Sequence, residues 1–430
     1  MTAPRPPLDD QAKPDPSQQP DQGSRRPRLA PTVIGLGLVS LFTDLSSETI
    51  FPLLPAYLAL LGASAVFVGA VEGSAELISN LLKYASGIYA DRRTRKKPLV
   101  LWGYGLSTLA RPLMAFTLAP WHVLVVRSLD RIGKGVRTSP RDALIAAAAP
   151  GKIRARAYGF HRAMDHAGAA LGTLLSAGLL FWLRELQGMS TLSAMRWIFA
   201  LALMPGLLAM AALILTPEST EHPSHSSSVD SHCEVSKLRM PPELVALVLF
   251  ACSNATDAFL IVKAISLGAS PELAPLLWLE LHVIKALLGA PAGRLADRFG
   301  KRLSLIVGWV VYATTWGSIG FVGTVALLFV ATAAYATSHG LVEGAEKALV
   351  AELAPHSGRG RAFGRYHLAV GLSGLVASLA FGAAWDRWGD RRAFIGSAIL
   401  ALVAAAWLAW LSMGRRNMIG VVPAAGNRDA

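Results

Sequence analysis

The chain has 430 residues, of which 53% are hydrophobic and 16% are charged, whereas a soluble domain carries about 25% charged residues. Together with a mean hydropathy of +0.43, this composition excludes an ordinary soluble domain and points to lipid as the surrounding medium. The net charge of +13 could suggest a nucleic-acid partner, but the positions of the charges argue against one.

Apolar stretches long enough to cross a bilayer as helices recur along the whole chain. We expect about 12 such spans, and they must be helical because a backbone in lipid has to satisfy its own hydrogen bonds. The sequence therefore predicts an all-α membrane protein. The spans are residues 33–61, 67–90, 98–120, 121–149, 157–183, 197–215, 244–268, 271–296, 303–321, 324–353, 362–384 and 394–413.

Basic residues alternate between loops in a way that predicts the topology. Lys and Arg gather in the loops at residues 92–97, 152–156, 298–302 and 359–361, and the loops at 62–66 and 268–271 carry none. The positive-inside rule therefore places the basic loops and both termini in the cytoplasm of a bacterial-type inner membrane. Residues 1–31 lack the apolar core of a signal peptide, and we expect them to form a disordered cytoplasmic tail. Residues 414–430 are expected to form a second cytoplasmic tail.

An internal repeat divides the chain into two halves. The segment GIYADR at 87–92 returns as GRLADR at 293–298, and LGAS at 61–64 returns at 267–270, both with an offset of 206 (293 − 87 and 267 − 61). Duplicated halves are a known plan of membrane transporters. We expect an N-terminal bundle at 32–216, a polar cytoplasmic linker at 217–242 and a C-terminal bundle at 243–413.

Two motifs resemble those of the major facilitator superfamily. Residues 293–302, GRLADRFGKR, match the family's loop motif G-x-L-A-D-R-x-G-R-K with the last two basic residues interchanged, and residues 127–135, RSLDRIGKG, are similar to its fourth-helix motif. The first loop copy departs from the motif at Tyr89 and Thr94, and Arg131 replaces a glycine. The resemblance implies two pseudo-symmetric six-helix bundles, alternating access around a central cavity and a small-molecule substrate, with a monomer as the default state.

The paired loop motifs supply candidate gating residues. A carboxylate at a helix end can meet the positive end of a neighbouring helix dipole, and glycine permits close helix approach. The resemblance implies a latch that stabilises the state closed to the cytoplasm; a merely topogenic basic loop is the alternative. The candidates are Gly87, Asp91, Arg92, Gly293, Asp297 and Arg298.

The fourth span carries a stripe of charges. At 100° per residue, its ionisable residues from Arg127 to Asp142 share one side of a helix. Charges at membrane depth are costly, so the stripe should face a watery cavity or paired carboxylates. We expect a cationic cavity wall that binds an anionic group or holds coupling carboxylates; a structural ion-pair network is the alternative. The deeper candidates are Arg127, Asp130, Arg131 and Lys134.

Carboxylates on the first span are candidate proton carriers. Asp44 and Glu48 are four residues apart and share a helical face, and a permanent salt bridge to Arg127 or Arg131 is the alternative. In the second half, Asp257 and Glu280 could complete the binding site or form structural pairs.

The polar linker holds the residues most suggestive of a metal, His222, His225, His232 and Cys233. Their Ser-rich surroundings and the lack of a paired C-x-x-C favour a plain linker, so no metal site is expected. With Cys252, the chain has two cysteines and no disulfide framework.

The motifs that are missing narrow the function. The sequence contains neither a phosphate-binding G-x-x-x-x-G-K-[ST] pattern nor a nucleophile elbow, so an ATP-driven pump or an intramembrane enzyme is not expected, and neither is a cofactor. The sequence favours a proton-coupled secondary transporter, and export over uptake, although Gly168-Ala169 lacks the proline of the family's antiporter motif. The alternatives are a proton symporter that takes up an anionic metabolite and a non-transporting sensor or scaffold.

Overall fold

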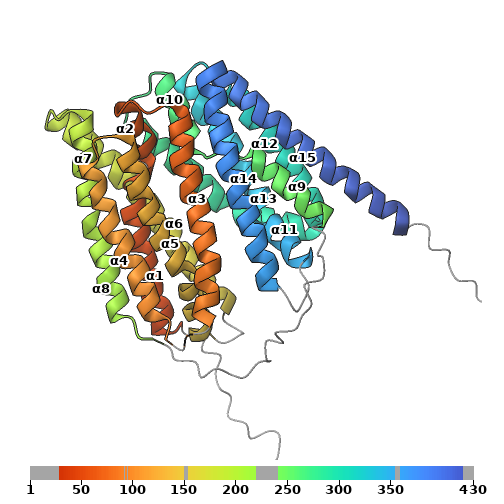
Figure 1. Cartoon of the computed structure of the whole chain (residues 1–430), viewed down its shortest axis with the longest axis horizontal. Helices are drawn as coiled ribbons and strands as arrows, with labels where there is room; N and C mark the ends of the chain where they lie inside the picture. Colours follow the sequence, from red (N-terminus) through yellow and green to blue (C-terminus); the bar gives the residue numbers. More distant parts are fainter. Residues whose placement is uncertain are drawn as a thin grey trace, which may run out of the picture.

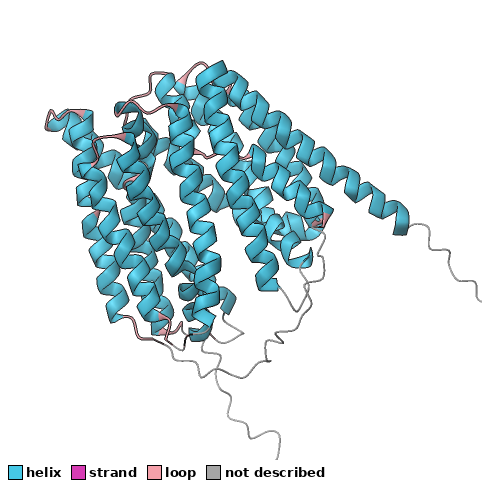
Figure 2. Cartoon of the chain, viewed as in Figure 1, coloured by secondary structure: helices cyan, strands magenta, loops and turns pink. Residues whose placement is uncertain are grey.

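The computed structural model describes residues 29–91, 93, 95–149, 154–218, 241–353 and 359–419. These ranges contain helices and short connections and no strand (Figures 1 and 2). The first half contains α1 (Pro31–Glu48), η2 (Phe51–Leu53), α2 (Leu54–Leu60), α3 (Ala65–Asp91), α4 (Lys97–Leu113), η3 (Met114–Phe116), α5 (Pro120–Ala148), α6 (Arg154–Phe181), η5 (Trp182–Leu186), α7 (Thr191–Leu201) and α8 (Leu203–Leu215). The second contains α9 (Pro242–Ser253), α10 (Ala258–Ser266), α11 (Leu273–Phe299), α12 (Lys301–Ile319), α13 (Val325–Leu353), α14 (Arg359–Trp388) and α15 (Asp390–Ile419).

The helices form two bundles that follow the predicted halves. Within the described ranges, eight segments are long and apolar enough to cross a membrane by length and composition alone. The segments α4, α5, α11 and α12 are not among them. For α5 the reason is its charge stripe, and its charges are sheltered by protein rather than by lipid. The last helix runs to Ile419, beyond the predicted end at residue 413.

Both halves break their first span at matching places. The first span ends its α-helix at Glu48 and passes through the 3-10 turn η2 into α2, where Pro52 and Pro55 interrupt the regular hydrogen bonding. The corresponding span of the second half breaks between α9 and α10. Gly62 and Gly268, which are 206 positions apart (268 − 62), adopt φ angles of 80° and 79°, a conformation that favours glycine. These matching features support the predicted repeat.

The second half is built around an aromatic core. Trp309, Trp316, Tyr312 and Phe394 are buried there, and Trp316 packs against Tyr335 and Phe394 with ring centroids 4.8 and 5.0 Å apart. The two buried cores of the first half are mostly aliphatic. Each half therefore has a packed interior of its own, and charged side chains lie between these cores and at the interface of the halves.

The halves meet mainly at the end of the bundle away from the end of α8 and the start of α9. We call the end where α8 stops and α9 starts the linker end and the opposite end the far end. At the far end, a Cβ on Gly69 of α3 would lie 2.2 Å from the Ser378 carbonyl oxygen of α14, so glycine is required for this approach. In Figure 1, α3 and α14 lie close at the far end and diverge toward the linker end.

Two polar contacts fasten the far end, and the repeat relates them. The Asp386 carboxylate of α14 accepts hydrogen bonds from the backbone N–H groups of Ala65 and Val66 at the start of α3, at 3.0 and 2.9 Å. Arg184, in the extension of α6, forms an ion pair with Glu272 just before α11. In each contact, the end of one half's fifth span meets the start of the other half's second span.

Candidate functional site

A cluster of buried charges occupies the N-terminal bundle. The Arg127 guanidinium donates two hydrogen bonds to Glu72 of α3, at 3.1 and 2.7 Å. The Arg111 Nε of α4 donates to Asp130 at 3.1 Å, and both side chains are 3% exposed. Asp130 also lies 3.8 Å from Arg127 and 3.9 Å from Arg131. These groups neutralise one another inside the protein, as buried charges must.

This cluster differs from the predicted cavity wall. The Arg127 and Asp130 side chains are 4% and 3% exposed, and Arg127 lies 3.6 Å above the Phe51 ring. Arg131 also stacks on Phe51, at 4.8 Å. In this structure these residues match the alternative of a structural network that joins α3, α4 and α5, and their role in a cavity wall stays a prediction.

Asp44 and Lys134 stand apart from this network. Lys134 sits in the middle of α5, and Asp44 lies one turn from the end of α1. Both are half-buried, and neither side chain forms a hydrogen bond or an ion pair with any residue that the structure describes. They lie within electrostatic range of each other, together with Asp165 and Glu48. A cation and a carboxylate inside two predicted spans therefore lack a direct partner among the described residues.

Glu48 bridges the two halves. Its carboxylate accepts a hydrogen bond from the indole N–H of Trp278 on α11 at 2.9 Å. Arg127 pairs with Glu72, and Arg131 lies near Asp130, so the permanent salt bridge from Asp44 or Glu48 to either arginine is not present. Any separation of α1 from α11 would break the Glu48–Trp278 bond.

Asp257 organises the C-terminal side of the interface. It accepts hydrogen bonds from Lys285 at 2.8 Å and from the Tyr335 hydroxyl at 2.5 Å. His339 lies 2.9 Å from the same hydroxyl and lines a cavity of about 190 Å³ together with Asn254, Glu343 and Glu346. Asp257 is thus a paired carboxylate next to a small polar cavity.

Glu280 is not brought to this site. On α11 it lies about 200° around the helix from Trp278, on the side where Leu276, Val283 and Leu287 are exposed. One of its carboxylate oxygens is buried without a hydrogen-bond partner among the described residues. Its predicted place in the binding site therefore finds no support in this geometry.

The predicted gating residues lie at the linker end. The side chains of Asp91, Gly293 and Asp297, and the whole of Arg92, lie outside the described part of the chain, so the latch stays a prediction. Arg298 is exposed and stacks on the neighbouring Phe299 ring at 5.4 Å.

Gly87 does not behave as expected for a close helix contact. A Cβ there would lie 3.5 Å from Ser139, which is an ordinary contact, so no close approach requires this glycine. By contrast, a Cβ on Gly168 of α6 would lie 2.2 Å from the Leu41 carbonyl oxygen of α1. The glycines of the fifth span thus allow α6 to pack tightly on the helix that carries Asp44.

Sequence reasoning missed Arg111 and the roles of Tyr335 and Trp278. Arg111 is an arginine inside an otherwise apolar span, and that alone marks it as a partner of a buried carboxylate. Tyr335 and Trp278 gave no comparable signal, because aromatic residues are common in membrane helices. The predicted linker metal ligands lie outside the described residues, and within those residues no group of three or more His, Cys, Asp or Glu could hold a metal.

Two repeated helical bundles, fastened to each other at one end and carrying charged side chains inside their spans, define a polytopic membrane carrier. The family model of the Major Facilitator Superfamily matches residues 36–281 and 244–420. The chain belongs to the major facilitator superfamily, and it is a multi-pass membrane protein with that family's 12-helix fold.

Individual relatives agree with this assignment. An uncharacterized MFS-type transporter of Methanocaldococcus jannaschii is 30% identical over 395 residues, 89% of this chain and 95% of that protein. The multidrug resistance protein MdtH of Yersinia enterocolitica is 31% identical over 144 residues, 33% of this chain and 36% of that protein. A bacterial homologue of the human lysosomal transporter Spinster, solved in an inward-facing and unoccupied conformation, superposes with a TM-score of 0.71 at 16% identity, covering 89% of this chain and 96% of that one.

Proposed function

We propose that this protein is a proton-coupled secondary transporter that exports a small solute by alternating access, as a monomer with both termini in the cytoplasm. The observation that carries the proposal is that Asp44 and Lys134 lie within electrostatic range of each other, while neither forms a hydrogen bond or an ion pair with a described residue. In the same bundle, Glu72, Arg111, Arg127 and Asp130 all have partners, whereas these two side chains have none among the described residues.

The coupling follows from electrostatics. While Lys134 is free, it stabilises the charged form of Asp44. A solute that occupies the space next to Lys134 alters this interaction, so that proton binding and solute binding depend on each other. A rotation of the halves would then expose Asp44 first to one side of the membrane and then to the other.

Two observations favour export over uptake. The partial similarity to a multidrug resistance protein covers a third of the chain and favours efflux. The far-end contacts close the side that the basic loops predict to be external. Solute would therefore enter from the cytoplasm in the conformation observed.

A flux assay in proteoliposomes tests the proposal. The protein is reconstituted with an internal pH-sensitive dye and challenged with amphipathic cations, neutral drugs and organic anions. We expect one of these classes of compound to drive protons across the membrane in the direction opposite to the compound's own movement. In Asp44→Asn this proton movement should be lost, while exchange of solute down its gradient persists.

The control is Asp142→Asn, which removes a carboxylate that is 44% exposed and pairs with Arg141, and it should keep full proton movement. Proton movement that survives in both Asp44→Asn and Glu48→Gln would rule out these carboxylates as proton carriers. If no compound produces a proton or solute flux, the result favours the alternative of a non-transporting sensor or scaffold.

The second candidate is a proton symporter for an anionic metabolite. The specific observation in its favour is Lys134, a cation at membrane depth without an ion-pair partner among the described residues. The same assay separates the two functions, because a symporter moves protons in the direction of the solute gradient.

A further inference from the structure

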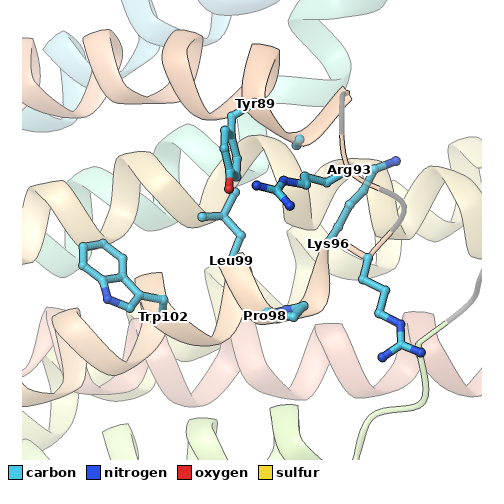
Figure 3. Close-up of a pocket in the computed structure, with 8 residues that line it drawn as sticks. Tyr89, Arg93, Lys96, Pro98, Leu99 and Trp102 are labelled. Atoms are coloured by element: carbon cyan, nitrogen blue, oxygen red, sulfur yellow. The ribbon is translucent and has the colours of Figure 1, made fainter.

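A hollow in the described structure lies outside the bundle interface, next to the loop between the second and third spans. It has a volume of about 700 Å³ and sits at the linker end, where α3 ends and α4 begins (Figure 3). It is lined by Tyr89, Arg93, Arg95, Lys96, Leu99 and Trp102, among others. Figure 3 shows the Arg93 side chain and the Tyr89 ring side by side above Leu99, and the guanidinium carbon lies 5.0 Å from the ring centroid.

The pocket is cationic, and no carboxylate that the structure describes pairs with its basic side chains. Arg93 and Arg95 are exposed and Lys96 is half-buried, and none of the three side chains forms an ion pair with a described residue. The nearby Glu218 instead accepts the backbone N–H groups of Lys96 and Lys97, at 2.9 and 3.1 Å. That carboxylate therefore fixes the backbone of the loop and leaves the side-chain charges free for an external anion.

The adjoining surface of α4 is apolar. Trp102, Leu109, Leu113 and Phe116 are 56%, 65%, 47% and 75% exposed. At 100° per residue the three α4 side chains, Trp102, Leu109 and Leu113, fall within about 40° of one another and form one exposed apolar stripe, which Phe116 in the following turn η3 continues. Trp102 lies about 7.5 Å above the start of α4, a depth suited to the interfacial region where Trp and Tyr concentrate.

We propose that this pocket binds the phosphate of an anionic phospholipid headgroup, with the acyl chains of that lipid lying along the α4 stripe. The three basic side chains match the charge of a phosphate, and basic residues at a membrane surface attract anionic lipids. Tyr89 and Trp102 hold the headgroup region from either side. A soluble phosphate would satisfy the same cations but would leave the apolar stripe unused.

Brominated lipids test the site, because bromine quenches tryptophan fluorescence at short range. The full chain and its Trp102→Phe variant are reconstituted in phosphatidylcholine vesicles that contain either brominated phosphatidylglycerol or brominated phosphatidylcholine. The difference between the two proteins reports on Trp102 alone. We expect stronger quenching by phosphatidylglycerol, and we expect Arg93→Gln/Lys96→Gln to weaken this preference about thirtyfold.

The charge-matched control is Arg387→Gln/Arg391→Gln, which removes two arginines that stack on Trp388 and Phe321 at the far end, and it should keep the preference. Equal quenching by the two lipids, or a preference that survives in Arg93→Gln/Lys96→Gln, would overturn the proposal. Inorganic phosphate is then added at matched ionic strength. If it reduces the preference more than chloride does, phosphate competes with the headgroup for the pocket, which supports the proposal; equal effects of the two salts indicate general charge attraction without a phosphate site and overturn it.

Discussion

Replacing Asp130 with asparagine should strongly destabilise the N-terminal bundle. The change keeps the shape of the side chain but removes the charge that faces three arginines, at 3.1 Å from Arg111, 3.8 Å from Arg127 and 3.9 Å from Arg131. Arg127 would still pair with Glu72, whereas Arg111 would keep only neutral acceptors, the amide oxygen of the new asparagine and the Thr43 carbonyl oxygen at 3.0 Å. A buried guanidinium would then lack a counter-charge.

The structure gives the size of the effect. Breaking a buried ion pair by removing one partner costs about 3–5 kcal/mol, and the 3% exposure of both partners places this pair in that class. Removing the charges of both partners should cost less than the two single changes combined. We therefore expect the Arg111→Gln/Asp130→Asn protein to fall at least about 1 kcal/mol short of additivity.

Unfolding of the purified proteins in a fixed detergent, by heat and by denaturant, measures these differences. The pair of Asp142 and Arg141 provides the control. Its side chains are 44% and 16% exposed, so the Asp142 carboxylate reaches solvent, and Asp142→Asn should cost less stability than Asp130→Asn. The reasoning is refuted if Asp130→Asn is no less stable than Asp142→Asn, or if the double variant shows simple additivity.

Two further predictions concern contacts at opposite ends of the bundle. Asp386→Asn should weaken the hydrogen bonds to the start of α3 by about 1–2 kcal/mol, which shifts the population toward a state open at the far end about five- to thirtyfold. Spin-label distances across the far end would report this shift, and an unchanged distance distribution would show that the Asp386 contact does not hold the far end closed. At the linker end, a hydrogen bond from Lys301 lowers the pKa of Glu352. The contact therefore stabilises the fold at any pH above about 4.3, the ordinary pKa of a Glu side chain. This stabilisation is lost as the pH falls through the lowered pKa. The stability difference between the wild type and Glu352→Gln should therefore be constant from neutral pH down to about 5 and shrink below that; a difference that does not change with pH would contradict this assignment.

The fold was largely predictable because it rests on periodic and repeated signals. Apolar length fixed the spans, and the two copies of the loop motif located the duplication. The break near Pro52 was visible in the sequence, whereas the corresponding break after Ser253 was not, because no proline marks it. Helix ends such as Ile419 were misplaced because polar residues continue a helix beyond the membrane.

The site was only partly predictable because pairing depends on packing in three dimensions. The stripe of charges on α5 was correctly recognised, but a helical wheel cannot show that Arg127 turns to Glu72 and Asp130 to Arg111. Asp44 and Lys134 were both candidates, and only the structure distinguishes them from their paired neighbours. For Glu280, a helical wheel does not show which face of α11 meets the other half, and its place in the binding site stays a prediction.

The two far-end contacts are related by the internal repeat, which gives the interface between the halves an approximate two-fold symmetry. Val66 and Glu272 occupy equivalent positions of the repeat (272 − 66 = 206), and each contacts the end of the opposite half's fifth span. The start of one half's second span therefore meets the end of the other half's fifth span twice, as in a dimer with two-fold symmetry. Two identical six-helix units would associate in this way without any linker. In a single chain the two copies can accept substitutions independently, and they now hold the interface with different chemistry, an ion pair on one side and a capped helix on the other.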